Sequence, residues 1–218
     1  MRQFEPKTAV LPPAQKYLWP QLAAAPGLSF VLYGGTAVAL HLGHRQSLDF
    51  DFFSAAPLDK KRLVTCFEFL AHAPTIQEDP NTLVVAARVK GNPVKVSFFG
   101  RLDIGHINEP LRTSDDVLLI ASLEDLLATK LKAIIDRAEA KDYIDIAAML
   151  TAGASLARGL GAFSEMFKSD PILPLRALGY FEDGDLHTVP PVQQKLLQAA
   201  RDRINQIPEI RLRPGLVV

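Results

Sequence analysis

The chain has 218 residues, of which 48% are hydrophobic and 22% charged, an ordinary composition for a globular protein with one large domain or two small ones. Its 24 basic and 24 acidic residues give a formal net charge of zero, which argues against broad non-specific binding to nucleic acids and leaves a local basic patch open. No stretch is long and apolar enough for a signal peptide or a membrane span, so we expect a cytoplasmic protein with no membrane partner.

The first predicted elements lie before residue 34. Residues 1–13 contain prolines and predict irregular structure, whereas residues 14–25 predict a helix that Pro20 interrupts or kinks. The apolar run 28–33 predicts a buried strand of the core.

A glycine pair follows this strand. Gly34 and Gly35 allow a tight turn, and Thr36 is a good N-cap for a short apolar helix over residues 37–42. The start of such a helix offers free N–H groups and the positive end of a dipole, which together favour a phosphate. A plain turn is the alternative for the glycine pair taken alone.

Residues 48–53 alternate strictly between apolar and other side chains, which predicts a strand. Asp49 and Asp51 would then share one face, about 6.6 Å apart. The other face would carry Leu48, Phe50 and Phe52. Two neighbouring carboxylates repel each other, and a divalent cation is the usual reason to keep them together, although a solvated sheet face is the simpler alternative. A phosphate-binding turn followed by a metal-binding pair suits phosphoryl or nucleotidyl transfer.

The middle of the chain predicts one helix and a series of strands. Residues 58–71 predict an amphipathic helix. Its inward face would carry Leu63, Cys66, Phe67 and Leu70, and its outward face Lys60, Lys61 and Arg62. Cys66 is the only cysteine, which excludes an internal disulfide, and its apolar neighbours predict a core position. Three strands in antiparallel hairpins are expected over residues 75–78, 82–89 and 94–99, and shorter strand-like pieces over 106–111 and 117–121.

The pattern becomes helical at Ser122, which opens a capping-box-like start with Asp125. Helices are predicted over residues 123–135, 141–150, 156–167, near 175 and over 192–204. The sequence therefore predicts an α/β (α+β) protein, a mixed sheet with flanking helices followed by a C-terminal α-helical lobe. We expect the division near residue 115, with domains at 1–115 and 116–218.

The residues Gly34-Gly35-Thr36, followed by Arg45, Ser47, Asp49, Asp51 and Phe53 at alternate positions, resemble the signature of the nucleotidyltransferase superfamily. The closest resemblance is to the AbiEii/AbiGii toxin family, over about residues 28–150. It implies a nucleotidyltransferase-like fold with the active site between sheet and helical lobe. The implied reaction transfers a nucleoside monophosphate from an NTP to an acceptor hydroxyl, on tRNA in some members, with Mg2+ as cofactor. The implied biological role is that of a toxin neutralised by a separate antitoxin protein.

The resemblance also assigns roles to single residues. Asp49 and Asp51 are expected to hold the metal, and the nucleotide is expected to contact Gly34, Gly35, Thr36, Arg45 and Ser47. Lys130 lies within the apolar stripe of its predicted helix, where a lysine either snorkels to the surface or meets an anion, and the resemblance directs it to the nucleotide phosphates.

A basic segment with two aspartates follows Lys130. Asp142 and Asp145 share a helix face, and Lys141 precedes them where the family usually has arginine. We expect this segment to hold Lys130 and the wall of the active site, with Asp142 as the catalytic participant. The alternative is a surface helix with acidic residues near its N-terminus, where the helix dipole favours them.

One position departs from the family pattern. Family members usually carry a third carboxylate on a later strand, and alternation puts Ser97 at that position, with Lys95 on the same face. Lys95 would offset negative charge there and disfavour a second cation, and nearby Asp103 is a possible substitute for the missing carboxylate. The departure leaves a rival function open, that of a catalytically weak NTP-binding or interaction protein that keeps the fold.

Overall fold

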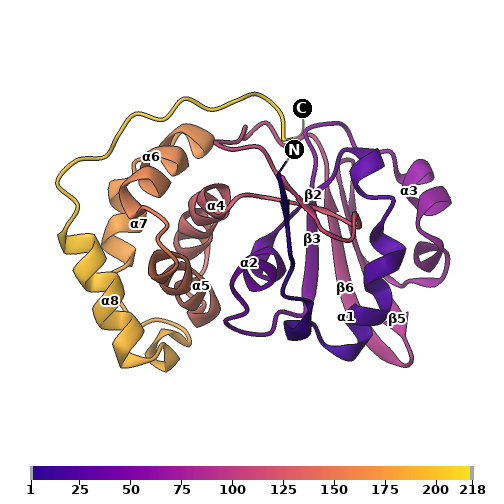
Figure 1. Cartoon of the computed structure of the whole chain (residues 1–218), viewed down its shortest axis with the longest axis horizontal. Coiled ribbons are helices and arrows are strands. Elements are labelled where there is room, and N and C mark those ends of the chain that lie inside the picture. The colour runs from indigo at the N-terminus through magenta and orange to yellow at the C-terminus, as the bar shows by residue number, and fades with distance from the viewer. Residues whose placement is uncertain (1, 217–218) are drawn as a thin grey trace. The chain divides into compact units, whose positions relative to one another are not determined.

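The structure is a computed structural model that describes residues 2–216 (Figure 1). The chain divides into two compact units. Unit 1 comprises residues 2–105, 109–122 and 214–216, and unit 2 comprises residues 106–108 and 123–213. The domain division predicted near residue 115 stays a prediction. None of the helices in residues 2–216 is both long enough and apolar enough to cross a membrane.

Unit 1 is built on a mixed sheet. Within the described residues its strands are β1 (Gln3–Phe4), β2 (Val31–Tyr33), β3 (Asp49–Phe53), β4 (Thr75–Asp79), β5 (Thr82–Val89), β6 (Asn92–Phe99), β7 (Leu111–Thr113) and β8 (Leu119–Ile120). They lie in the order β1-β7-β8-β2-β3-β6-β5-β4. The β3–β6, β2–β8 and β1–β7 pairs are parallel and the others antiparallel. The predicted mixed sheet and the β4–β5–β6 hairpins are confirmed.

The core of unit 1 lies against one face of β3. Phe50 and Phe52 are fully buried there, and Phe52 stacks on Phe98 of β6 with ring centroids 5.3 Å apart. Trp19 packs on Phe50 from the 3-10 helix Trp19–Leu22, which follows α1 (Pro13–Leu18). These aromatic contacts hold β3 and β6 together from one side and leave the opposite face of both strands for polar residues.

The segments around β2 differ from prediction in detail. The expected helix over residues 14–25 is split between Leu18 and Trp19 into α1 and the 3-10 helix, and Pro20 lies in the first turn of the 3-10 helix. Another 3-10 helix, Pro26–Leu28, shortens the expected strand to β2. The helix α2 (Gly34–Leu42) begins at Gly34, so Tyr33 is the N-cap residue and the prediction of Thr36 as N-cap is wrong. Because Gly34 alone makes the turn from β2 into α2, Thr36 lies within the first turn of the helix.

The predicted helix over residues 58–71 is two elements. The helix α3 (Lys60–Cys66) ends at Phe67, which is extended with φ −118° and ψ 97°, and a 3-10 helix, Glu68–His72, follows. The break turns Phe67 into the core, where its ring centroid lies 5.3 Å from that of Phe98. Cys66 is exposed, so its predicted core position is wrong.

Two other predictions on the segments before unit 2's helices also fail. Leu48 was expected on the apolar face of β3, but the strand begins at Asp49 and Leu48 is 66% exposed. The piece over 106–111 is not a strand; β7 begins at Leu111, and His106 instead forms an isolated bridge with Arg213.

Unit 2 is helical, as predicted. Its helices are α4 (Leu123–Asp136), α5 (Ala140–Thr151), α6 (Leu156–Phe167), α7 (Ile172–Ala177) and α8 (Pro191–Asp202) (Figure 1). The helix α4 packs against α5, α6 and α7. Gly159 of α6 allows a close approach to α4, because a Cβ at this position would lie 2.7 Å from the Leu127 side chain.

Candidate active site

The two aspartates of β3 lie on the polar face of the sheet, as the alternation predicts. The parallel pairing with β6 sets Asp49 beside Lys95 and Asp51 beside Ser97. Since paired residues of neighbouring strands project to the same face, the four side chains form one group on unit 1. The expectation that Ser97 shares a face with the carboxylate pair is confirmed.

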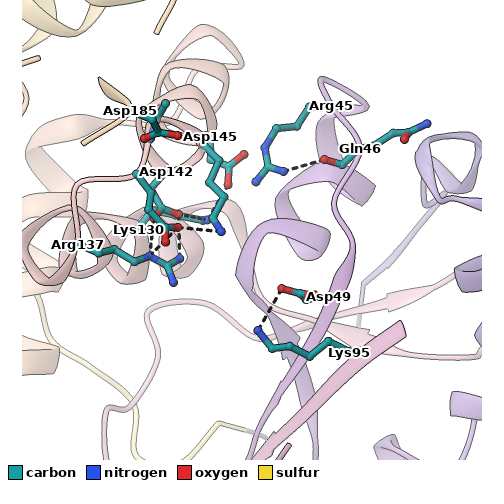
Figure 2. Close-up of polar contacts among 12 residues, drawn as sticks. Arg45, Gln46, Asp49, Lys95, Lys130, Arg137, Asp142, Asp145 and Asp185 are labelled. Atoms are coloured by element: carbon teal, nitrogen blue, oxygen red, sulfur yellow. Dashed lines mark hydrogen bonds and ion pairs between the residues drawn. The ribbon is translucent and has the colours of Figure 1, made fainter. Parts of the chain in front are cut away.

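Asp49 forms an ion pair with Lys95. The Lys95 Nζ lies 3.2 Å from the Asp49 Oδ2, and both side chains are partly exposed, at 45% and 37% (Figure 2). Solvent screens such a pair, so it contributes little to stability and its partners can separate at small cost.

Asp51 is placed by its contact with Gly34. The φ of Gly34 is +72°, and a Cβ at this position would lie 3.2 Å from the Asp51 Cγ and closer still to a carboxylate oxygen. Only glycine therefore combines this backbone angle with the carboxylate in its place. The sequence suggested a phosphate turn here and missed that Gly34 makes room for Asp51.

Thr36 also connects α2 to the carboxylate strand. Its hydroxyl donates a hydrogen bond to the backbone carbonyl of Asp49, and the residue is 1% exposed. No side-chain hydrogen bond from Tyr33 caps α2, so the first N–H groups of α2 remain the phosphate-binding candidates that the sequence predicted. Gly35 lies in this first turn.

Ser97 occupies the position of the missing carboxylate. It is 1% exposed, and its Oγ has no hydrogen-bond partner within residues 2–216. Over the same residues, no set of three or more His, Cys, Asp and Glu side chains is arranged to hold a metal, so Asp103 does not complete a triad with Asp49 and Asp51. Two carboxylates and an unpartnered hydroxyl are a hard oxygen set that fits Mg2+, an ion that keeps several of its waters and needs few protein ligands.

Arg45 and Ser47 lie in the connection between α2 and β3, and both are half-buried. The Arg45 Nη1 donates a hydrogen bond of 2.8 Å to the Gln46 carbonyl (Figure 2). Their assignment to the nucleotide stays a prediction.

Lys130 of α4 is buried in an ion cluster of unit 2. It is 5% exposed, and its Nζ lies 2.6 Å from both the Asp142 Oδ1 and the Asp145 Oδ2 (Figure 2). The two aspartates are fully buried on α5. Snorkelling is therefore excluded for Lys130, and the expectation that both aspartates hold it is confirmed geometrically.

Arg137 is a member of this cluster that the sequence reasoning missed. Its Nε lies 2.9 Å from the Asp142 Oδ2, whereas Lys141, the basic residue that the motif suggested, pairs with Glu139 at 2.8 Å. The missed signal is a basic residue five positions before Asp142, in the connection between α4 and α5. Asp142 thus has two cationic partners, Lys130 and Arg137, and the Arg137 Nε also lies 3.3 Å from the Glu139 Oε2.

The two cationic partners of Asp142 keep its carboxyl group ionised. Burial alone would raise the pKa of Asp142, but the charges and hydrogen bonds of Lys130 and Arg137 outweigh burial and lower the pKa below its ordinary value. Asp142 therefore holds Lys130 as a carboxylate at neutral pH.

Comparisons with known proteins identify the family and the fold. The family described as "Nucleotidyl transferase AbiEii toxin, Type IV TA system" matches residues 21–210. An uncharacterized protein of Aquifex aeolicus (strain VF5), aq_aa25, is 30% identical over 119 residues, which are 54% of this chain and 55%, about half, of the Aquifex protein.

Two solved structures share the fold. One is a protein of H. pylori classed as a nucleotidyltransferase, with a TM-score of 0.56 and 20% identity over 87% of this chain and 90% of that chain. The other is MenT4, the nucleotidyltransferase toxin Rv2826c of Mycobacterium tuberculosis H37Rv, with a TM-score of 0.58 and 13% identity over 85% and 82%. The family match spans most of the sequence, and the chain belongs to the AbiEii nucleotidyltransferase toxin family of type IV toxin–antitoxin systems.

Proposed function

We propose that this protein transfers a nucleoside monophosphate from an NTP to an acceptor hydroxyl, with Asp49 and Asp51 as the ligands of Mg2+. The observation that carries the proposal is the carboxylate pair on the polar face of β3, with Gly34 at the start of α2 making room for Asp51. This arrangement brings two metal-type ligands next to a helix start suited to phosphates.

In the proposed reaction the acceptor oxygen bonds to the α-phosphorus, the bond from that phosphorus to the bridging oxygen breaks, and pyrophosphate leaves. The Mg2+ supplies charge neutralisation and alignment of the phosphates when it is bound. The N–H groups of the first turn of α2, at Gly34, Gly35 and Thr36, would bind phosphate oxygens, and Arg45 and Ser47 would contact the nucleotide. The acceptor proton would pass to solvent water, since the neutral hydroxyl of Ser97 stands where the family usually has a third carboxylate.

Lys130 and Asp142 enter the proposal together. An ammonium group has three N–H donors, and two of them point to Asp142 and Asp145. We assign the third to a phosphate oxygen of the substrate, with Asp142 fixing the direction of the ammonium group.

The finer parts of the proposal concern partners. We propose tRNA as the acceptor, and a separately encoded antitoxin protein as the partner that neutralises the activity. The family match supports a toxin–antitoxin role in general terms.

A rival function rests on the residues beside the carboxylates. Ser97 replaces a third acid and Lys95 pairs with Asp49, which favours a nucleotide-binding protein with weak or no transfer activity. Binding of NTP without transfer to any acceptor would support this rival.

The proposal predicts that Asp49→Asn and Asp51→Asn each abolish magnesium-dependent NTP binding and transfer while the fold is retained. Asparagine keeps the shape of aspartate and removes the charge that a divalent cation needs. Calorimetry with NTP, with and without Mg2+, measures binding, and labelled NTP with total RNA measures transfer.

Asp79→Asn is the matched control, because it removes the same charge from an exposed residue of β4. The control is expected to behave like the wild type. Unchanged binding and transfer in both Asp49→Asn and Asp51→Asn would rule out the mechanism.

A further inference from the structure

Lys95 and Asp49 are held next to each other by the sheet. They are register partners on the parallel strands β3 and β6, whose backbones lie about 4.8 Å apart in any sheet. The backbones of the two residues therefore stay next to each other. The contact between the Lys95 Nζ and the Asp49 Oδ2, at 3.2 Å, can be broken only if a side chain rotates away.

The carboxylate of Asp49, which pairs with Lys95, has a second proposed partner. In the proposed function, which this inference rests on, Asp49 is a ligand of a divalent cation. An ammonium group at 3.2 Å competes with such a cation by occupying the oxygen and by electrostatic repulsion. Ser97, the neighbour of Asp51, carries no charge, so β6 sets a cation beside one carboxylate of the pair and a neutral group beside the other.

We propose that Lys95 is a displaceable counter-ion of Asp49 that couples metal binding to nucleotide binding. Without nucleotide, Lys95 occupies the Asp49 carboxylate and weakens its affinity for the cation. When an NTP binds, its phosphate oxygens offer the ammonium group a stronger partner, and the flexible lysine side chain turns from Asp49 to the phosphates. The carboxylate is then free for the cation, so each ligand strengthens the binding of the other.

The exposure of the pair makes this exchange feasible. Both side chains are more than a third exposed, and an exposed ion pair is easily exchanged for another partner. The buried Lys130 is the contrast within this chain: its two carboxylates are fully buried, and taking the ammonium group away from them is costly.

The test measures Mn2+ binding by the signal of free Mn2+ in electron paramagnetic resonance, without nucleotide and with a non-hydrolysable NTP analogue. Lys95→Gln is expected to tighten Mn2+ binding without nucleotide about three- to tenfold, because it removes one charge next to the cation. The strengthening of Mn2+ binding by the analogue is expected to shrink in Lys95→Gln.

Lys60→Gln is the matched control. Lys60 forms an ion pair with Glu78 at 3.0 Å on the β4 side of the sheet, with side chains 28% and 56% exposed, and the substitution changes the net charge equally. It should bind Mn2+ as the wild type does, which separates the local effect of Lys95 from a general effect of charge.

Two results would overturn the inference. If the wild type binds Mn2+ and Lys95→Gln binds it no more tightly than Lys60→Gln, or keeps the full effect of the analogue, then Lys95 does not couple the two ligands and the proposed function stands. If neither the wild type nor Lys95→Gln binds Mn2+, the metal role of Asp49 fails, and with it both the proposed function and this inference.

Discussion

Gly34 is the residue on which the geometry of the carboxylate pair depends most directly. Its φ of +72° is an angle that side chains other than glycine rarely adopt, and the Asp51 carboxyl group fills the space in which a Cβ would lie. A substitution at Gly34 therefore acts on the backbone and on the proposed metal ligand together.

We expect Gly34→Ala to lower the free energy of unfolding by about 1–3 kcal/mol and to displace the Asp51 side chain. Urea unfolding measures the first effect, and loss of Mn2+ binding in the folded variant measures the second. Gly27→Ala is the control, because a Cβ at Gly27 meets nothing within 4 Å and its φ is not positive. Equal stability of the two variants would contradict the role given to Gly34.

Residues whose role depends on local periodicity were predictable from the sequence. The common face of Asp49 and Asp51 follows from the two-residue period of a strand, which needs no knowledge of the rest of the chain. The role of Thr36 does not follow in this way, because its hydroxyl reaches the carbonyl of Asp49, 13 residues later, once β3 has folded against α2. Cys66 was misplaced for a similar reason, since the end of α3 is set by the packing of Phe67 on β6.

The cluster of Lys130, Asp142 and Asp145 belongs to the scale of elements, because it joins α4 to α5. Opposite charges in the interior compensate each other for the loss of water. Removal of one of them leaves the other buried with less compensation. The sequence singled out Lys130 by its place in an apolar stripe and the two aspartates by their common helix face, and the family resemblance supplied their expected roles. It did not identify Arg137, whose contact with Asp142 depends on the path of the chain between the two helices.

We expect Lys130→Met to lower the free energy of unfolding by about 3–5 kcal/mol, because two buried carboxylates lose the ammonium group that they share. Adding Asp145→Asn to this variant should recover part of the loss by removing one of the two buried carboxylate charges. Urea unfolding at neutral pH measures both variants.

Lys132→Met is the control on the same helix, since Lys132 is partly exposed and pairs with Asp136 on the surface. Its effect should stay within about 1 kcal/mol. A Lys130→Met variant as stable as the control would contradict the cluster, and any change in its NTP affinity is interpretable only while the variant remains folded.

At the scale of the whole molecule, the strand order decides where the chain can be divided. The strand β8 lies between β7 and β2, and residues 118–121 are buried. The sequence predicted a strand-like piece over 117–121, but a boundary drawn at 115 assigns it to the helical part. A sequence pattern indicates whether a segment is a strand or a helix, but not which strands lie beside it in the sheet. The place of β8 between β7 and β2 could therefore not be predicted.

We expect a fragment that ends at residue 122 to fold more stably than one that ends at residue 115. The shorter fragment loses buried Leu118, Leu119 and Ile120, which together contribute about 5–9 kcal/mol of apolar burial, and it interrupts the sheet between β7 and β2. Thermal unfolding followed by circular dichroism compares the two. A cooperative transition at the same temperature in both would show that β8 is dispensable.

Unit 1 is made of three separate segments, and the last of these, residues 214–216, includes the buried Leu216. During synthesis the sheet strands leave the ribosome first, whereas this last segment follows only after the whole of unit 2 has been translated. Domains usually fold in the order in which they emerge. In this chain the synthesis of unit 1 begins before that of unit 2 and ends after it, so unit 2 is fully synthesised before unit 1 is complete.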